Sequence, residues 1–178
     1  MTQDVTQDVT QDMTQDTAPR PKPAAPLRPA RDDQVLSDEV LSDEVLYRAV
    51  ANDPDRYLPL DAQGNRRVSS TVFNDAGRRP SVDRAALCPG GPQETRARFS
   101  PGSGVLSVVA GDVRALTATH GGTGRVYGVD VEPVPLAANP AHAEIFGQPP
   151  FDTDKVFERI KQALARLATV ALPPDALA

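Results

Sequence analysis

Short repeats at the N-terminus separate the part of this chain that can form a folded core from the part that cannot. Residues 1–17 contain the units TQDV, TQDV, TQDM and TQDT, and residues 35–44 contain VLSDE twice. On a helix the four-residue period would align Asp4 with Asp8 as like charges at i,i+4, which is destabilising. Threonine and aspartate are also poor helix formers. We therefore expect the TQD repeats to be disordered, or to fold only on a partner.

The VLSDE repeat fits neither regular element. Its five-residue period advances about 140° per copy on a helix and swaps faces at each copy on a strand. We expect residues 1–44 to be a disordered low-complexity tail and acidic linker, residues 45–172 to form one compact domain, and residues 173–178 to be a disordered C-terminus. A domain of roughly 130 residues can bury one modest core.

Composition excludes several classes of protein. The formal net charge is −5, so the chain has no general attraction to phosphate backbones and we expect no nucleic-acid partner. Cys88 is the only cysteine, which excludes a disulfide framework and a cysteine-based metal site. No apolar run approaches the roughly 18 residues of a membrane span, and no basic start precedes an apolar stretch. We expect a soluble, cytoplasmic protein with no membrane partner, no metal and no cofactor.

Short segments rich in Val, Thr, Phe and Tyr have the composition of strands. The better candidates are residues 45–50, 104–109, 126–131 and 141–146, and the weaker ones are 67–73 and 81–83. Residues 112–116 fit a helix or a continuation of the sheet, and residues 93–98 fit one helical turn.

The last element has the clearest pattern. Asp152, Thr153 or Asp154 can cap a helix that runs to about Val170, before two prolines end it. Apolar residues recur at 3/4 spacing on one face, namely Val156, Phe157, Ile160, Leu164, Leu167 and Val170. The sum predicts an α+β fold: a small mixed or antiparallel sheet of four to six short strands with a C-terminal amphipathic helix.

The glycine-rich segment at residues 120–124 has two interpretations. A phosphate-binding loop must open a helix whose N-terminus faces the phosphate. Here the segment leads into a predicted strand, and no Gly-Lys-Ser/Thr follows. We therefore expect a hairpin turn.

His142 and Glu144 are candidate catalytic residues. Two residues apart on a strand, they share one face of the sheet. A histidine beside a carboxylate can act as an acid/base pair. The alternative is a half-buried histidine bonded to a neighbour.

Arg48 lies in the middle of the first predicted strand, next to Tyr47 and between apolar residues. A guanidinium on a buried face needs a partner. It could pair with Asp83 or Glu144, or it could bind an anionic ligand. Tyr47 and Asp83 are accordingly candidate ligand-binding residues.

Ser69 and Ser70 form a hydroxyl cluster with Thr71. A serine nucleophile needs a strained turn or a nearby base, and the local sequence supplies neither. Asp83 could bond these hydroxyls, so Ser69 is a ligand-binding candidate and Ser70 a catalytic one. Cys88 is expected to be inert unless a cation such as Arg84 lies close to it.

Four patches resemble a group of short bacterial proteins to which no activity is assigned. The patches are Leu46-Tyr47-Arg48, Arg67-Val68-Ser69-Ser70-Thr71-Val72-Phe73, Ser81-Val82-Asp83 and Asn139-Pro140-Ala141-His142-Ala143. The resemblance covers about residues 45–147. It implies that the four patches belong to one domain, and it brings no catalytic residues.

A second resemblance is to the ADP-ribosyltransferase-like folds, which include toxins with an Arg–Ser–Glu set. Arg48, Ser69-Ser70 and Glu144 occur here in that order. The resemblance implies that the arginine and serine would steady a nicotinamide dinucleotide and the glutamate would polarise its ribose. The chain departs from the pattern at His142, where such enzymes have an acidic residue.

The leading hypothesis from the sequence is a non-catalytic module that binds a protein partner or a small ligand. The alternative is a small ADP-ribosyltransferase-like or nuclease-like enzyme that uses Arg48, Ser70 and either Glu144 or His142. The enzyme hypothesis requires these side chains to meet in one open cleft. A binding module allows them to be scattered or held in internal bonds.

Overall fold

The computed structural model describes residues 39–177 of the 178-residue chain. The TQD repeats, and the expectation that they are disordered, lie outside these described residues.

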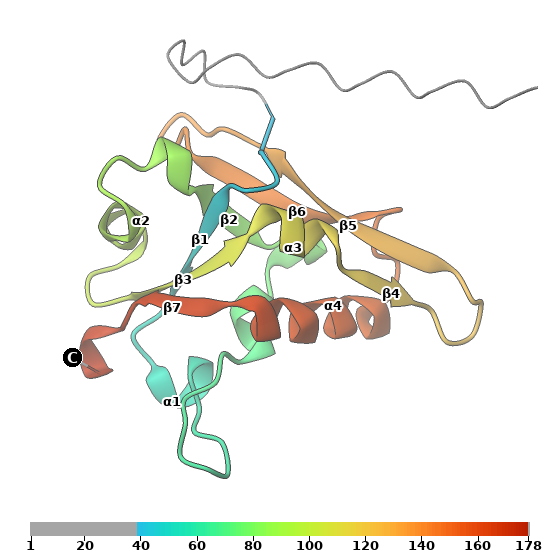
Figure 1. The fold of residues 1–178 in the computed structure, drawn as a ribbon, viewed down its shortest axis with the longest axis horizontal. Helices are drawn as coiled ribbons and strands as arrows, with labels where there is room; N and C mark the ends of the chain where they lie inside the picture. The colour runs from blue at the N-terminus through green and yellow to red at the C-terminus, as the bar shows by residue number, and fades with distance from the viewer. Residues whose placement is uncertain (1–38, 178) are drawn as a thin grey trace, which may run out of the picture. The chain divides into compact units, whose positions relative to one another are not determined.

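Seven strands form one sheet (Figure 1). They are β1 (Val45–Val50), β2 (Ser81–Arg84), β3 (Gly104–Val109), β4 (Thr117–Thr119), β5 (Val126–Pro133), β6 (His142–Gln148) and β7 (Thr169–Leu172). Their order is β4-β5-β6-β2-β1-β3-β7, and every neighbouring pair is antiparallel. The predicted α+β class is confirmed. The sheet has more than the four to six strands expected, because β4 and β7 are short edge strands that the sequence pattern did not reveal.

Four α-helices connect or cover the strands: α1 (Pro54–Tyr57), α2 (Pro92–Phe99), α3 (Ala110–Arg114) and α4 (Asp154–Leu167). The predicted cap of α4 is Thr153, whose hydroxyl accepts a hydrogen bond from the backbone N–H of Val156. The predicted apolar stripe is buried at Val156, Phe157, Ile160 and Leu164, whereas Leu167 is half-buried and Val170, which lies beyond the helix, is 46% exposed. The helix ends at Leu167 and not at Val170, because Thr169 already begins β7.

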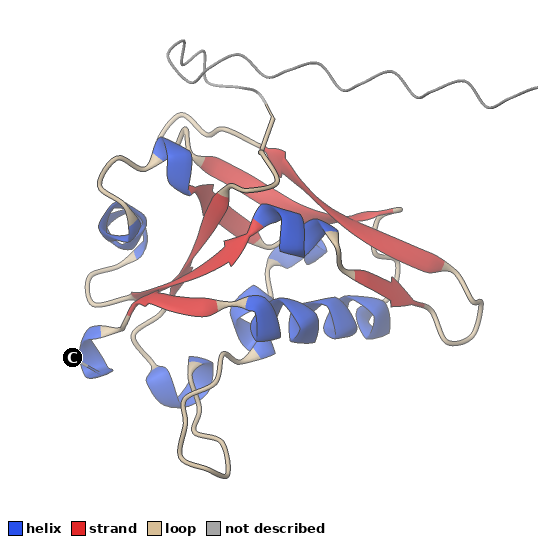
Figure 2. Ribbon diagram, in the orientation of Figure 1, coloured by secondary structure: helices blue, strands red, loops and turns tan. Residues whose placement is uncertain are grey.

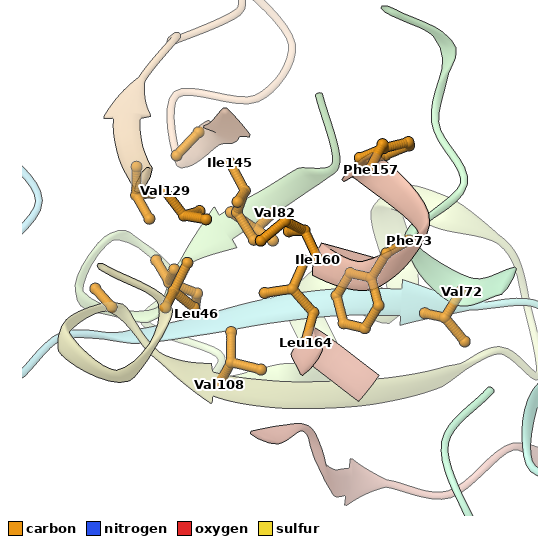
Figure 3. Close-up of a cluster of buried hydrophobic side chains, with 14 of the residues drawn as sticks. Leu46, Val72, Phe73, Val82, Val108, Val129, Ile145, Phe157, Ile160 and Leu164 are labelled. Atoms are coloured by element: carbon orange, nitrogen blue, oxygen red, sulfur yellow. The ribbon is translucent and has the colours of Figure 1, made fainter. Parts of the chain in front are cut away.

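The sheet is curled, and α4 lies between its two edge strands, β4 and β7 (Figure 2). Ile160 and Leu164 of α4 reach the inner side of the sheet, where they join Leu46, Val82 and Ile145 in the core (Figure 3). All five are at most 3% exposed. Burying a side chain of this size stabilises the folded state by about 1.5–3 kcal/mol, so this inner cluster holds the sheet and α4 together.

Residues 67–73, a weaker strand candidate from the sequence, do not form a strand. They end in a 3-10 helix, η1 (Ser70–Phe73), which packs on α4. Val72 and Phe73 are 4% and 0% exposed and fill the space beneath α4. The segment's β-branched and aromatic residues thus reflect burial, not strand pairing.

The domain includes residues beyond the limits expected from the sequence. Val40 is 1% exposed, and Glu44 forms an ion pair with Arg84 of β2. At the other end of the chain, a 3-10 helix, η4 (Asp175–Leu177), begins at Asp175. The carboxylate of Asp175 forms an ion pair with Arg96 of α2. Residues 39–44 and 173–177 are therefore part of the folded unit.

Candidate functional site

Three polar side chains lie in a row across the outer face of the sheet, the face opposite α4. In the strand register Tyr47 of β1 is opposite Asp83 of β2, and Asp83 is opposite His142 of β6. Because side chains alternate between the faces of a strand, residues paired in this way share one face. The three strands thus bring together residues that are almost 100 positions apart in the chain.

Helix α2 covers one side of this row (Figure 1). It begins after Gly91, which has a φ of 61°, and Pro92 occupies its first turn, where a missing N–H costs nothing. The helix presents Thr95, Arg98 and Phe99 to the row. Phe99 is 56% exposed, so much of its ring is open to solvent.

Asp83 is the most constrained side chain of the site. Its carboxylate accepts hydrogen bonds from the hydroxyl of Thr95 at 2.8 Å, the guanidinium of Arg98 at 3.0 Å and the side-chain amide of Asn139 at 2.7 Å. Burial alone would lower the pKa of Arg98, but its bonds to Cys88 and Asp83 raise that pKa overall. Asp83 therefore fixes α2 and the Asn139 loop to the sheet.

His142 has a defined tautomer. Its Nδ1 lies 2.9 Å from the carbonyl oxygen of Val134, and a carbonyl can only accept, so Nδ1 carries the proton. In the neutral ring Nε2 is then an acceptor. Among residues 39–177 no hydrogen bond to Nε2 is found, so it is available to a ligand that donates a hydrogen bond.

Arg48 finds its partner in Asp75, and not in Asp83 or Glu144 as the sequence suggested. The guanidinium also donates to the carbonyl oxygens of Val72 at 2.8 Å and Ser81 at 2.7 Å. The Asp75 carboxylate in turn accepts the backbone N–H of Ser81. Arg48 thus ties β1 to β2 and to η1, and its bonding capacity is largely used.

A cavity of about 420 Å³ opens at this position. Its lining comprises Tyr47, Arg48, Ala49, Asp75, Ser81, Val82, Asp83, Thr95, Arg98, Phe99, Asn139 and His142. This volume lies within the range of sites for small ligands. The cavity brings together four of the seven residues proposed from the sequence: Tyr47, Arg48, Asp83 and His142.

The charges around the cavity are already neutralised. Arg48 pairs with Asp75, and Arg98 pairs with Asp83. In contrast, the Tyr47 hydroxyl and the Ser81 hydroxyl form no hydrogen bond within the described part of the chain. Together with Nε2 of His142 they are the hydrogen-bonding groups that a ligand could use.

The other three predicted residues lie elsewhere and have partners of their own. Ser69 caps η1 and bonds the hydroxyl of Thr71 at 2.8 Å. Ser70 donates to Glu158 of α4 at 3.1 Å. Glu144 shares the outer face with His142, but it forms an ion pair with Arg79 and does not line the cavity.

Sequence reasoning missed several lining residues. Arg98 and Phe99 lie at the end of α2, of which only one turn was expected, and helices this short and polar carry no apolar stripe to reveal them. Asp75 follows η1 in a segment with no motif. Asn139 was part of a patch already noted, and its place before a proline was the only signal.

Within residues 39–177 no group of three or more His, Cys, Asp or Glu side chains is arranged to hold a metal ion. No helix in that range has the length and apolar character needed to cross a membrane.

Comparison with known proteins adds no family. No protein-family model, no curated protein and no solved structure matches the chain. The function must therefore be argued from the geometry of the site.

Proposed function

We propose that this protein is a non-catalytic binding module whose outer-face cavity takes a small, uncharged, ring-containing ligand. The observation that carries the proposal is the contrast within the cavity. Its charged groups are paired with each other, whereas the Tyr47 hydroxyl, the Ser81 hydroxyl and Nε2 of His142 are unused.

The chemistry of the ligand follows from these groups. An ionic ligand would have to compete with the Arg48–Asp75 or Arg98–Asp83 pair, whose side chains are at most 22% exposed. A neutral ligand needs only to donate to His142 and to exchange a hydrogen bond with Tyr47 or Ser81. The exposed ring of Phe99 offers an aromatic surface for a planar group.

The four patches that resemble the group of short bacterial proteins support the same site. Three of them supply lining residues, including Tyr47, Asp83 and His142. The fourth supplies the Val72 carbonyl that Arg48 bonds. We propose that the resemblance reflects a shared binding cavity.

The enzyme alternative, ADP-ribosyl transfer or phosphodiester cleavage, needs Arg48, Ser70 and either Glu144 or His142 in one cleft. Ser70 bonds Glu158 and Glu144 bonds Arg79, and neither lines the cavity. This arrangement favours the binding module.

A thermal-shift screen of the full chain tests the proposal. The compounds are small neutral ring compounds and nucleotides, with nicotinamide dinucleotide included. A ligand that binds only the native state must raise the melting temperature. We expect at least one neutral compound to do so, and we expect Phe99→Ser and His142→Ala to abolish the shift.

Matched controls are Leu136→Ser, at another exposed apolar residue, and His120→Ala, at the other histidine. Both should keep the shift. A shift that survives in both cavity variants would contradict the proposal. A shift only with nicotinamide dinucleotide would favour the enzyme alternative.

A further inference from the structure

A second depression lies between the residues before η1 and the C-terminal half of α4. It has a volume of about 690 Å³ and shares no residue with the cavity described above. Its lining is Arg66, Arg67, Val68, Ser70, Gln162, Ala165, Arg166, Ala168, Thr169 and Val170. We refer to these ten residues as the basic groove.

The basic groove is positively charged although the chain as a whole is acidic. Its lining includes three arginines and no acidic residue, whereas the net charge of the chain is −5. The nearby Glu158 bonds Ser70 and Gln162 of the groove, and its charge is paired with Lys161. Arg166 is exposed and has no hydrogen bond or ion pair among residues 39–177. Such a local concentration of one sign of charge attracts groups of the opposite sign.

The other two arginines are only partly neutralised. Arg66 contacts Asp55 at 3.5 Å, and the side chain of Asp55 is 94% exposed, so this pair is weak. Arg67 pairs with Asp61 at 2.7 Å, but its own side chain remains 70% exposed. Arg66 also donates to the carbonyl oxygen of Leu58 at 2.8 Å, so Arg67 and Arg166 are the two arginines of the groove with most donors left for a carboxylate.

An open strand edge borders the basic groove. The strand β7 (Thr169–Leu172) is the last of the sheet and pairs only with β3 among the described strands (Figure 1). Its outer edge carries N–H and C=O groups that can pair with another extended chain. Proteins commonly protect such edges with a charge or a proline inside the strand. The four residues of β7 include neither.

We propose that this edge and the basic groove together bind an extended acidic peptide segment of a partner protein. The segment adds to β7 as an eighth strand, and its alternate carboxylates face Arg166 and Arg67. Val170, which lines the groove and is 46% exposed, packs against the apolar part of the segment. Strand addition gives affinity through the backbone, and the side-chain contacts give specificity.

Other occupants fit less well. A nucleic acid would satisfy the arginines but could not use the alternating donors and acceptors of a strand edge. A second copy of this chain, paired through β7, would bring two sets of three arginines toward each other. An acidic peptide satisfies both the charge and the edge.

The test uses the full chain and a fluorescein-labelled seven-residue peptide of alternating valine and aspartate, measured by anisotropy. We expect saturable binding that weakens as salt is raised. The double variant Arg67→Gln/Arg166→Gln should bind at least about tenfold more weakly. Lys155→Gln, a charge removal at the other end of α4, should bind within about twofold of the unaltered chain.

A second peptide, N-methylated at alternate residues, keeps the charges but loses donors needed for strand pairing. We expect its affinity to be at least about tenfold lower. Equal affinity for both peptides would overturn strand addition. No binding of the first peptide, arginine-dependent binding of oligonucleotides in its place, or dimerisation of the chain through β7 would overturn the assignment of the occupant.

Discussion

Arg48 of β1 forms an ion pair with Asp75 that links the strand to the segment after η1. The sequence placed a guanidinium on a mostly apolar strand and required a counter-charge. The structure supplies Asp75, from the segment after η1, which no local pattern connects to β1. The side chains of Arg48 and Asp75 are 17% and 18% exposed, so the pair is shielded from water. Its first role is to hold the wall of the cavity.

Removal of the Arg48 side chain should therefore destabilise the fold. We expect Arg48→Ala to lower the free energy of unfolding by about 3 kcal/mol, because Asp75 loses its counter-charge and two backbone carbonyls lose the guanidinium as donor. Urea denaturation measures this change.

A double-mutant cycle with Asp75→Ala separates the pair from its surroundings. The two losses should be non-additive by about 2 kcal/mol. Additive losses would mean that the ion pair does not contribute as described. Arg48→Lys is the matched variant. It should recover only part of the loss, because an ammonium group has three donors on one atom and lacks the planar fork with which the guanidinium bonds both Asp75 oxygens and two carbonyls.

At the scale of elements, predictions succeeded where a pattern was long or a strand was buried. The apolar stripe of α4 and the strands at residues 45–50 and 104–109 were predicted with nearly the observed bounds. The sequence-based predictions missed β7, because its residues are mostly exposed and continue the helical spacing of α4. They also failed for residues 67–73, where burial beneath α4 decides the conformation.

The residues of the candidate site that lie on strands could be predicted from the sequence, and those on loops and helices could not. Tyr47, Asp83 and His142 lie on strands, where alternation assigns each side chain to a face. Ser69 and Ser70 are candidates from the sequence because Asp83 could bond their hydroxyls, but Ser69 caps η1 and Ser70 bonds Glu158 of α4. Which residues of separate loops and helices approach the sheet depends on tertiary contacts that one sequence does not encode locally.

The cap of α4 gives a prediction at the same scale. Thr153→Ala should lower the free energy of unfolding by about 1 kcal/mol, because the N–H of Val156 loses its acceptor. Thr153→Ser should retain most of the stability. Thermal or urea unfolding of both variants checks the effect, and equal losses in the two would show that the hydroxyl is not the cause.

For the whole molecule, several carboxylates link stability to pH. A hydrogen bond from Lys161 lowers the pKa of Glu158 below its ordinary value of 4.5. A hydrogen bond from Tyr127 lowers the pKa of Asp152 below 3.8. Burial would raise the pKa of Asp130, but a hydrogen bond from Arg114 lowers it overall.

Each of these groups binds a proton less readily when folded than when unfolded. Their stabilising effect is therefore fully present above the ordinary pKa and is lost as the pH falls through the folded pKa. We expect the free energy of unfolding to decrease as the pH is lowered below 4.5 and to do so less steeply in Glu158→Gln. Urea denaturation over a series of pH values measures both slopes, and a stability that rises on acidification would contradict this account.

The outer-face cavity, we propose, binds a small neutral ligand. Titration of the ¹⁵N-labelled full chain with a set of neutral ring fragments, followed through the backbone amide signals, tests this binding at the level of single residues. We predict that the fragments which bind will shift amides around Tyr47, Asp83 and His142, and that Phe99→Ser will remove these shifts. Fragments that perturb only amides elsewhere, such as those beside the basic groove, would contradict the claim.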